Sequence, residues 1–163
     1  MDPLVASVAN EDLLVELLNT TPVIDESPVE KLDAAWVSDR GCSAGDVGAL
    51  RRLRADLQDV VRGRAEPVAL NERLRALAVF PELLSDGTVT WRSEQEPSTG
   101  LEQRILLGWI SAASARPGRL RGCGNNECNL FLLDRSRSGV GRWCSMATCG
   151  NRLKARRFSA KKN

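Results

Sequence analysis

Four of the five cysteines of this 163-residue chain form two matched pairs whose spacing could bind a metal ion. Each pair encloses four residues, and fifteen residues separate the pairs. A four-residue spacer lets both sulfurs of a pair turn towards one point. The chain has no histidine, so sulfur is the natural ligand. Four thiolates leave no open position on zinc, which predicts one structural Zn²⁺ and no catalytic metal. The predicted ligands are Cys123, Cys128, Cys144 and Cys149.

Two other uses of these cysteines are two disulfides or an iron–sulfur cluster. Disulfides persist in exported proteins, but the first twenty residues show neither a basic start nor an apolar run long enough for export. No segment approaches the roughly 20 apolar residues needed to span a bilayer. We therefore expect a cytoplasmic protein without a membrane partner, in a reducing compartment that favours zinc. Cys42 has no partner in sequence and is expected to be an unliganded thiol.

Charge is distributed unevenly along the chain. Residues 1–120 contain 13 Lys and Arg against 19 Asp and Glu, whereas residues 121–163 contain 10 against 2, namely Glu127 and Asp134. A basic segment attached to an acidic one predicts an anionic partner for the basic end. Nucleic acid is the first expectation, followed by an acidic protein or a membrane surface.

The hydrophobic pattern predicts a mainly helical (α+β) domain over residues 1–116. Ser27–Pro28–Val29–Glu30 resembles a capping box with proline at the first helical position. Residues 80–92 predict one β-hairpin around Asp86–Gly87, which should pack on the helices because a hairpin alone is unstable. Pro117–Gly118 ends the last helix. The other helices are expected at 10–18, 43–61, 67–79 and 99–116.

Residues 119–163 predict a small zinc module with a basic C-terminal helix. The strand-like segment 130–133 is expected to pair with 142–143 across the loop 136–141. Ser145 is a predicted N-cap for a helix that runs towards Ser159. A turn, a hairpin and a helix with one ligand pair at each end form a treble-clef-like module. About 40 residues bury too little apolar surface to fold readily alone, so zinc should stabilise them.

The end of the chain resembles a known family. Trp143–Arg152 reads WCSMATCGNR and is followed by Leu153–Arg157, which is similar to the signature of the CGNR zinc-finger family. In that family the finger follows an N-terminal ABATE domain, and the proteins are described as bacterial stress-induced transcription regulators. Residues 14–20 resemble the opening of that domain, although aspartate is usual where this chain has Glu16. The resemblance implies a DNA-binding regulator.

Cations of the module are the candidate contacts to double-stranded DNA. On an ideal helix Arg152 and Arg156 share one flank, whereas Lys154 and Arg157 share another. Arg152 could contact DNA, stack on Trp143 or bind a backbone carbonyl. Asn151 could make a structural hydrogen bond or contact adenine. The candidate nucleic-acid contacts are Arg152, Lys154, Arg156, Arg157 and Lys161 of the helix and Arg135, Arg137 and Arg142 of the loop.

These features predict a transcription regulator whose N-terminal domain senses a ligand or mediates assembly. The alternative is a zinc-stabilised adaptor whose basic tail docks on an acidic protein. RNA is less expected because the module offers few aromatic side chains for stacking. No catalytic residue is predicted, since the chain lacks histidine and a phosphate-binding glycine motif. A ligand pocket could form near Trp36, Trp91 and Trp109, and a homodimer is left open.

Overall fold

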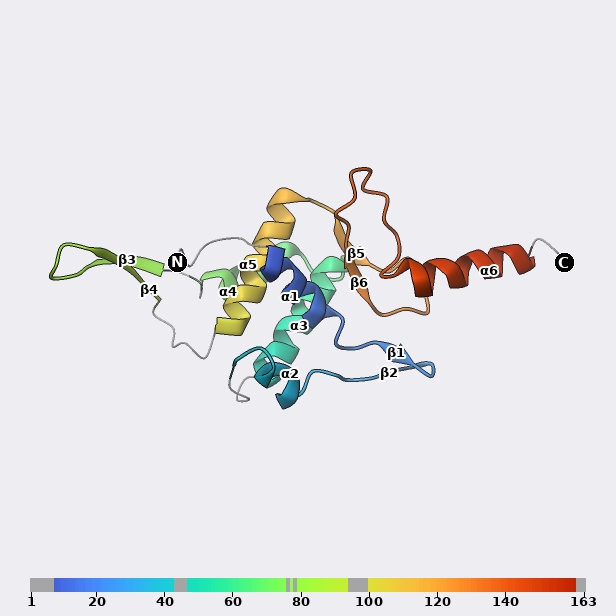
Figure 1. Ribbon diagram of the computed structural model, residues 1–163, viewed down its shortest axis with the longest axis horizontal. Helices are drawn as coiled ribbons and strands as arrows, with labels where there is room; N and C mark the ends of the chain where they lie inside the picture. The colour runs from blue at the N-terminus through green and yellow to red at the C-terminus, as the bar shows by residue number, and fades with distance from the viewer. Residues whose placement is uncertain (1–7, 43–46, 76, 78, 94–99, 161–163) are drawn as a thin grey trace.

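A computed structural model of the chain describes residues 8–42, 47–75, 77, 79–93 and 100–160. As predicted, it is mostly helical, with small two-stranded sheets and a four-cysteine module at its C-terminal end (Figure 1). The helices are α1 (Val8–Leu18), α2 (Ala34–Ser38), α3 (Val47–Val61), η2 (Pro67–Leu70), α4 (Asn71–Arg75), α5 (Gly100–Ala115), η4 (Met146–Gly150) and α6 (Asn151–Ala160). The strands are β1 (Val23–Ile24), β2 (Ser27–Pro28), β3 (Val79–Leu83), β4 (Val89–Ser93), β5 (Leu120–Gly122) and β6 (Phe131–Leu133).

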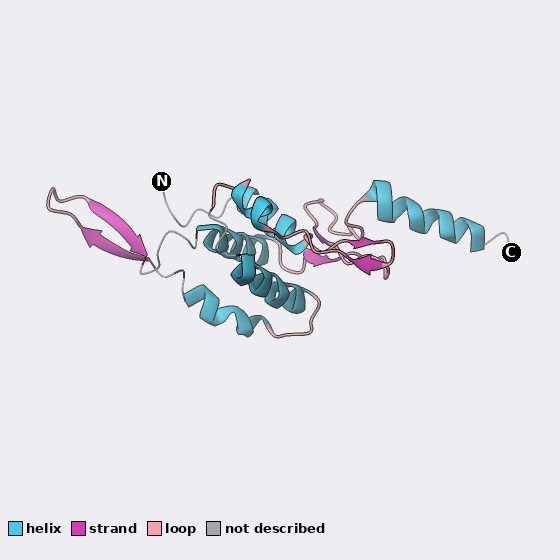
Figure 2. Cartoon of the chain, turned by 90° about the horizontal axis from the view of Figure 1, so that it is seen from below, coloured by secondary structure: helices cyan, strands magenta, loops and turns pink. Residues whose placement is uncertain are grey.

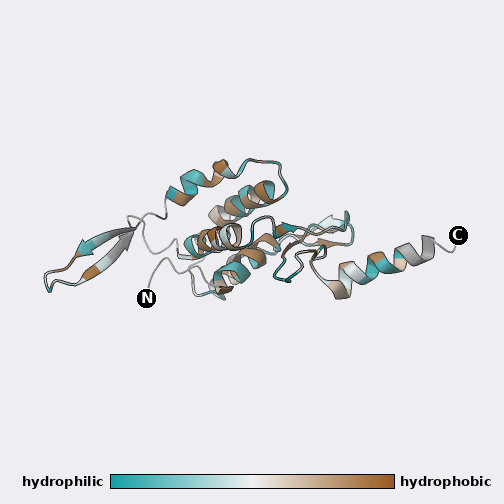
Figure 3. Ribbon diagram, turned by 90° about the horizontal axis from the view of Figure 1, so that it is seen from above, coloured by the Kyte–Doolittle hydropathy of each residue, from teal (hydrophilic) through white to brown (hydrophobic). Residues whose placement is uncertain are grey.

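Helices α1, α3 and α5 form the body of the molecule around one hydrophobic core. Leucines recur at helical spacing in α1 and α3, so that one face of each helix is apolar and becomes buried. Helix α5 adds Leu101, Ile105, Leu106 and Ala112 to the same core. Figure 3 shows the resulting brown bands on the helices of the body. Helices were predicted in all three of these segments.

Helices α1 and α5 approach each other unusually closely at Gly108. A Cβ atom added there would lie 2.2 Å from the carbonyl oxygen of Asn10 on α1. Only the absence of a side chain lets the two backbones come this near. Asn10 lies inside α1 and does not cap it, since the helix begins at Val8.

The predicted capping box at Ser27–Glu30 is wrong. Ser27–Pro28 is strand β2, which pairs antiparallel with β1 across a two-residue turn at Asp25 and Glu26. Both turn residues have positive φ, 48° and 64°, as a type I′ turn requires. The Glu30 carboxylate accepts hydrogen bonds from Arg54 (2.5 and 2.7 Å) and so takes part in a tertiary ion pair. Helix α2 begins later, where Asp33 caps it.

The β3–β4 hairpin forms where it was predicted, but its tip does not pack on the helices. The register pairs Leu83 with Val89, and their side chains remain 73% and 56% exposed. The turn is centred on Ser85–Asp86, with Gly87 following at φ 80°. Figure 2 shows the hairpin projecting from one end of the molecule and α6 from the other. The helix predicted over 67–79 is shorter, because α4 ends at Arg75 and β3 begins at Val79. The predicted helix start at 43–46 lies outside the described residues.

The sheet of the zinc module is formed by other segments than predicted. Strand β6 pairs with β5, which precedes the first cysteine pair, so that Cys123 and Cys128 lie at the end of a β-hairpin. Segment 142–143 instead contacts this hairpin through one hydrogen bond, from Gly124 N–H to the Arg142 carbonyl (2.7 Å). Ser145 accepts a hydrogen bond from Thr148 N–H and caps the following helical segment, as predicted. The segment begins as the π-helical turn η4 and continues as α6.

The zinc module shares the core of the helical body. Phe131 of β6 is 1% exposed and belongs to the same apolar cluster as α1, α3 and α5. The side chain of Asn19, just after α1, binds the backbone of Phe131 through two hydrogen bonds. Phe131 N–H donates to Asn19 Oδ1 (2.7 Å), and Asn19 Nδ2 donates to the Phe131 carbonyl (3.1 Å). Arg62, which follows α3, lies over the Phe131 ring at 4.4 Å. The module is therefore held against the body by packing and hydrogen bonds together.

Candidate metal centre and nucleic-acid interface

The first cysteine pair is held in a tight turn at the end of the β5–β6 hairpin. Cys123 N–H donates to the Leu130 carbonyl (2.8 Å), which extends the strand pairing by one step. Cys128 N–H donates to the Asn125 carbonyl (2.8 Å) and closes the turn. The four-residue spacer thus brings both sulfurs of the pair to the same side of the hairpin end.

The second cysteine pair flanks the start of the C-terminal helical segment. Cys144 precedes the cap residue Ser145, and its N–H points at the sulfur of Cys123 (3.5 Å). Cys149 lies within η4, where the Gly150 N–H reaches back to the Ser145 carbonyl (3.1 Å). Cys149 is buried. The extra residue of the π-turn accommodates the four-residue spacer between the two cysteines.

The four sulfurs converge as a tetrahedral metal site requires. The Sγ atom of Cys144 lies 3.6 Å from that of Cys128 and 3.7 Å from that of Cys149. All four Sγ atoms lie within 4.8 Å of one another. Four sulfurs placed about 2.3 Å from a tetrahedral zinc ion are about 3.8 Å apart, whereas a disulfide bond is about 2.0 Å long. The cysteines therefore form a site for one structural zinc ion.

The surroundings of the metal-free thiols shift the pKa values of three of them, and not all in the same direction. Burial raises the pKa of Cys128 to about 11 and also raises the pKa of Cys144. Burial acts in the same direction on Cys149, but hydrogen bonds, led by that of the Asn125 amide, lower the pKa of this cysteine. Zinc binds thiolates, so occupation of the site releases protons.

Asn125 is a functional residue that the spacing of the cysteines did not reveal. Its side chain is 2% exposed, and its amide Nδ2 donates to the sulfur of Cys149 (3.6 Å). Its Oδ1 accepts from Glu127 N–H (3.3 Å). One side chain thus stabilises the first turn and orients a ligand from the second pair. A polar residue inside a cysteine spacer was the only signal available in the sequence.

Trp143 connects the two halves of the site. Cβ atoms added at Gly124 and Gly150 would lie 3.0 and 3.2 Å from the indole ring, so both glycine backbones contact it. The guanidinium of Arg142 lies over the ring at 5.5 Å. The stacking position proposed for Arg152 is therefore used by Arg142 in this part of the structure. A Cβ atom at Gly150 would also lie 2.8 Å from the sulfur of Met146, so a side chain at this position would crowd both Met146 and the indole ring.

The cations of α6 lie in different surroundings. Arg152 and Lys154 are exposed, and Asn151 donates to the Ala147 carbonyl (3.4 Å). Arg156 forms an ion pair with Glu127 at 2.6 Å. The hydrogen bond from Arg156, with a smaller contribution from the charge of Arg152, lowers the pKa of Glu127. The side chain of Arg157 and all of Lys161 lie outside the described residues.

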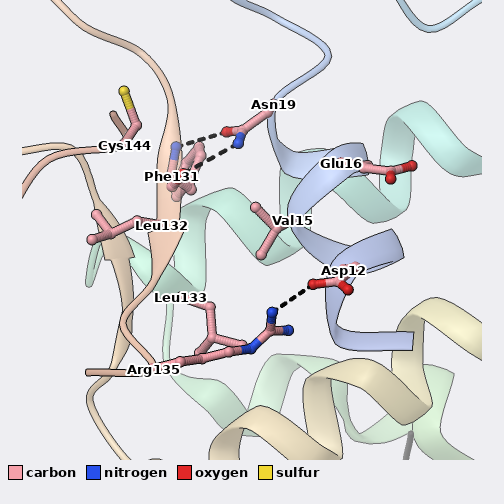
Figure 4. Close-up of a pocket in the computed structure, with 9 residues that line it drawn as sticks. All are labelled: Asp12, Val15, Glu16, Asn19, Phe131, Leu132, Leu133, Arg135 and Cys144. Carbon is pink, nitrogen blue, oxygen red and sulfur yellow. Dashed lines mark hydrogen bonds and ion pairs between the residues drawn. The ribbon is translucent and has the colours of Figure 1, made fainter. Parts of the chain in front are cut away.

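Of the three candidate arginines in the loop, Arg135 is already engaged. It pairs with the buried Glu11 (3.1 Å) and with Asp12 (2.7 Å), both on α1. Figure 4 shows the pair with Asp12. Glu11 is 2% exposed and also binds Arg116. Arg135 thus fastens the module to the helical body. Arg137 and Arg142 are exposed.

Asp134 organises the loop that carries these arginines. Its carboxylate accepts from Ser136 N–H (2.9 Å) and Gly141 N–H (2.8 Å) and pairs with Arg121 (3.0 Å). The hydrogen bonds of Ser136, with those of Gly141 and the charge of Arg119, lower the pKa of Asp134 to about 2. Asp134 thus anchors arginines of the hairpin and its loop, while Glu127 binds an arginine of α6.

The pocket expected near Trp36, Trp91 and Trp109 is not tested, because the side chain of Trp91 is not described. A pocket of ≈ 430 Å³ lies between α1 and β6, lined by Glu16, Leu132 and Cys144 among others (Figure 4). Trp36 lies elsewhere, under the guanidinium of Arg40 at 3.7 Å. Trp109 packs against the core. The side chain of Trp91 lies outside the described residues.

Cys42 lies apart from the four clustered cysteines, and its thiol faces the Arg40 carbonyl oxygen at 3.8 Å.

Among the described residues, no helix has the length and apolar character needed to cross a bilayer.

Comparison with known proteins agrees with the metal site. A search of curated proteins finds no match. Residues 119–162 match the family described as the CGNR zinc finger, whereas no ABATE domain is detected in the chain. The match spans both cysteine pairs and most of the basic end. Residues 119–162 thus match the CGNR zinc finger, and the four cysteines within them form a site for one structural zinc ion.

Proposed function

We propose that the zinc finger binds double-stranded DNA and that the protein is a transcription regulator. The observation that carries the proposal is the position of α6. The helix starts at the zinc site and projects away from the body, with Arg152 and Lys154 exposed (Figure 1). Exposed cations on a rigid helix can follow phosphates along a groove.

The charge of the module supports the same proposal. Residues 121–163 contain ten cations and two acids, and one zinc ion with four thiolates subtracts two charges. Both acids are internally paired, Asp134 with Arg121 and Glu127 with Arg156. The exposed cations Arg137 and Arg142 of the loop would extend the contact surface beyond α6.

In this proposal the helical N-terminal part is an ABATE-like domain that senses a ligand or mediates assembly. The pocket between α1 and β6 is the candidate ligand site, because it adjoins Cys144 of the zinc site. Regulators that bind operators are often dimers, so a homodimer belongs to the proposal. We propose no catalytic role, since the closed thiolate site offers no water position. A cytoplasmic, nucleoid-associated location follows from the proposal.

The test measures binding of the zinc-loaded full chain to a labelled duplex by fluorescence anisotropy at several salt concentrations. Lys154→Gln should weaken binding and reduce the slope of log K against log salt by about 0.9, the value for one phosphate contact. Arg75→Gln on α4 is a matched control, since α4 lies on the body away from α6 (Figure 1). The control should bind as the unchanged protein does. Absence of duplex binding even at low salt would refute the proposal.

A protein–protein adaptor is the second candidate, and the β3–β4 hairpin favours it. The hairpin exposes Leu83, Leu84 and Val89 at its tip, where apolar side chains gain by burial in a partner. The ion pair between Arg156 and Glu127 also supports this candidate, because a carboxylate of a partner protein could pair with α6 in the same way. Competition distinguishes the two candidates, because DNA should displace an acidic protein bound to α6 and should not affect one bound to the hairpin.

A further inference from the structure

A cleft of ≈ 670 Å³ separates the β1–β2 turn from α6. On one side it is lined by Asp25 and Glu26, the two residues of the turn, which we call the acidic turn. On the other side it is lined by Arg152 and Arg156, which we call the inner flank of α6. Segments about 125 residues apart in the sequence thus present opposite charges to one space. Figure 1 shows the β1–β2 hairpin extending beneath the zinc module on the same side of the body as α6.

The floor of the cleft adds further negative charge. Glu127 lines it and pairs with Arg156 at 2.6 Å. Cys128 also lines it, and a zinc ion held by four thiolates carries a net charge of about −2. The inner flank therefore faces three carboxylates and the metal centre, and Arg156 is paired with one of these carboxylates.

The opposite flank of α6 has different surroundings. Lys154 is two residues from both Arg152 and Arg156, so on a helix it points about 160–200° away from them. It is exposed and does not line the cleft. We call the face that carries Lys154 the outer flank. A phosphate that approaches the outer flank meets no carboxylate of the cleft, whereas one that approaches the inner flank meets three.

The backbone conformation of the acidic turn disfavours the glutamate at its second position. Asp25 and Glu26 have φ values of 48° and 64°. A type I′ turn strongly prefers Asn–Gly or similar pairs, and glutamate tolerates this conformation poorly. At the second position the turn therefore carries the carboxylate of Glu26 where glycine would fit the backbone better, whereas aspartate is among the residues that suit the position of Asp25.

We propose that the acidic turn prevents nucleic-acid phosphates from reaching the inner flank of α6, so that a duplex contacts the outer flank instead. This inference rests on the proposed function, because it specifies which face of α6 meets DNA. It assigns Asp25 and Glu26 an orienting role in recognition. It also narrows the contact surface of the proposed function to the outer flank, because Arg152 and Arg156, although exposed, then neutralise the cleft and the zinc centre instead of contacting phosphates.

The experiment compares duplex binding by zinc-loaded full-length variants between about 50 and 200 mM salt, where phosphate contacts dominate the salt dependence. Asp25→Asn/Glu26→Gly removes both carboxylates and introduces the pair that a type I′ turn prefers, so the hairpin is retained. A second protein combines this change with Arg152→Gln/Arg156→Gln. The charge-matched control is Asp39→Asn/Glu72→Gln, whose sites lie at the end of α2 and on α4.

Removal of the acidic turn should raise affinity at least about threefold at low salt and steepen the salt slope by about 1 to 2, since each added phosphate contact contributes about 0.9. The gain should disappear when both arginines are replaced, and the control should show less than half of it. Equal slopes with and without the acidic turn would overturn the inference while leaving DNA binding intact. So would a gain that persists without the arginines. If no variant binds a duplex, the proposed function fails and the inference fails with it.

Discussion

Replacing Asn19 by alanine should weaken the whole molecule, because this side chain joins the zinc finger to the helical body. Its amide brackets the backbone of Phe131 with two hydrogen bonds, of 2.7 and 3.1 Å. Phe131 is 1% exposed, so water cannot replace these partners. In effect Asn19 supplies the pairing that a third strand would give to β6.

The expected cost follows from the groups left unpaired. A buried N–H or C=O without a partner costs about 1–3 kcal/mol, so leaving both groups of Phe131 unpaired should cost about 2–6 kcal/mol. This is a large part of the ~5–15 kcal/mol stability of an ordinary domain. Asn126→Ala is the control, since Asn126 is exposed on the cysteine turn and should change stability by less than about 0.5 kcal/mol.

Urea unfolding provides the assay, with helix content followed by circular dichroism and zinc release followed by a colour-forming chelator. Because Phe131 belongs to the core shared by α1 and β6, both signals of Asn19→Ala should shift together to lower urea. The reasoning is wrong if the midpoint stays within error of the unchanged protein. It is equally wrong if the helix signal shifts while zinc release does not, since the finger would then be independent of the body.

Three further predictions concern the close helix contact and the zinc site. Gly108→Ala should destabilise the protein by about 1–3 kcal/mol or more, because its Cβ would meet backbone at 2.2 Å; an unchanged urea midpoint would contradict the contact. Asn125→Ala should weaken zinc binding about 10- to 100-fold in competition with a chelator, since it removes the hydrogen bond to Cys149. Asn126→Ala, its exposed neighbour, should retain normal affinity. Zinc affinity should fall as pH decreases, because burial raises the pKa of Cys128 to about 11 and protons compete with the metal. Dialysis from neutral to mildly acidic pH, with zinc measured by elemental analysis, should show progressive loss, and retention independent of pH would exclude thiolate ligation.

The sequence pattern of a segment predicted its secondary structure correctly where that structure depends on contacts within the segment. The leucines of α1 and α3 repeat at helical spacing, and these helices form with the predicted faces buried. The cap at Ser145 is likewise local, since its side chain binds the N–H three residues on. In each case the deciding contacts are made within about one helical turn.

The sequence pattern gave a wrong prediction where a residue distant in the sequence binds the side chain that was expected to cap a helix. Glu30 has the spacing of a capping box with Ser27, but its carboxylate binds Arg54. A bidentate ion pair with a largely buried arginine stabilises more than a capping hydrogen bond at an exposed helix start. The segment therefore extends as β2 and leaves α2 to begin at Asp33. Nothing near Ser27 in the sequence indicates that Arg54 will be adjacent.

The zinc site itself could be predicted from the sequence, because two cysteine pairs with four-residue spacers supply four thiolate ligands and the chain has no histidine to replace them. The tertiary structure decided which residues surround that site. It brought Asn125 to Cys149, Arg135 to Glu11, and the acidic turn to the inner flank of α6. Ligand spacing is a property of neighbouring residues, whereas compensation of charge depends on which distant side chains the fold places within a few ångströms. For that reason the sequence identified the metal and the basic helix, and only the structure distinguished the two flanks of that helix.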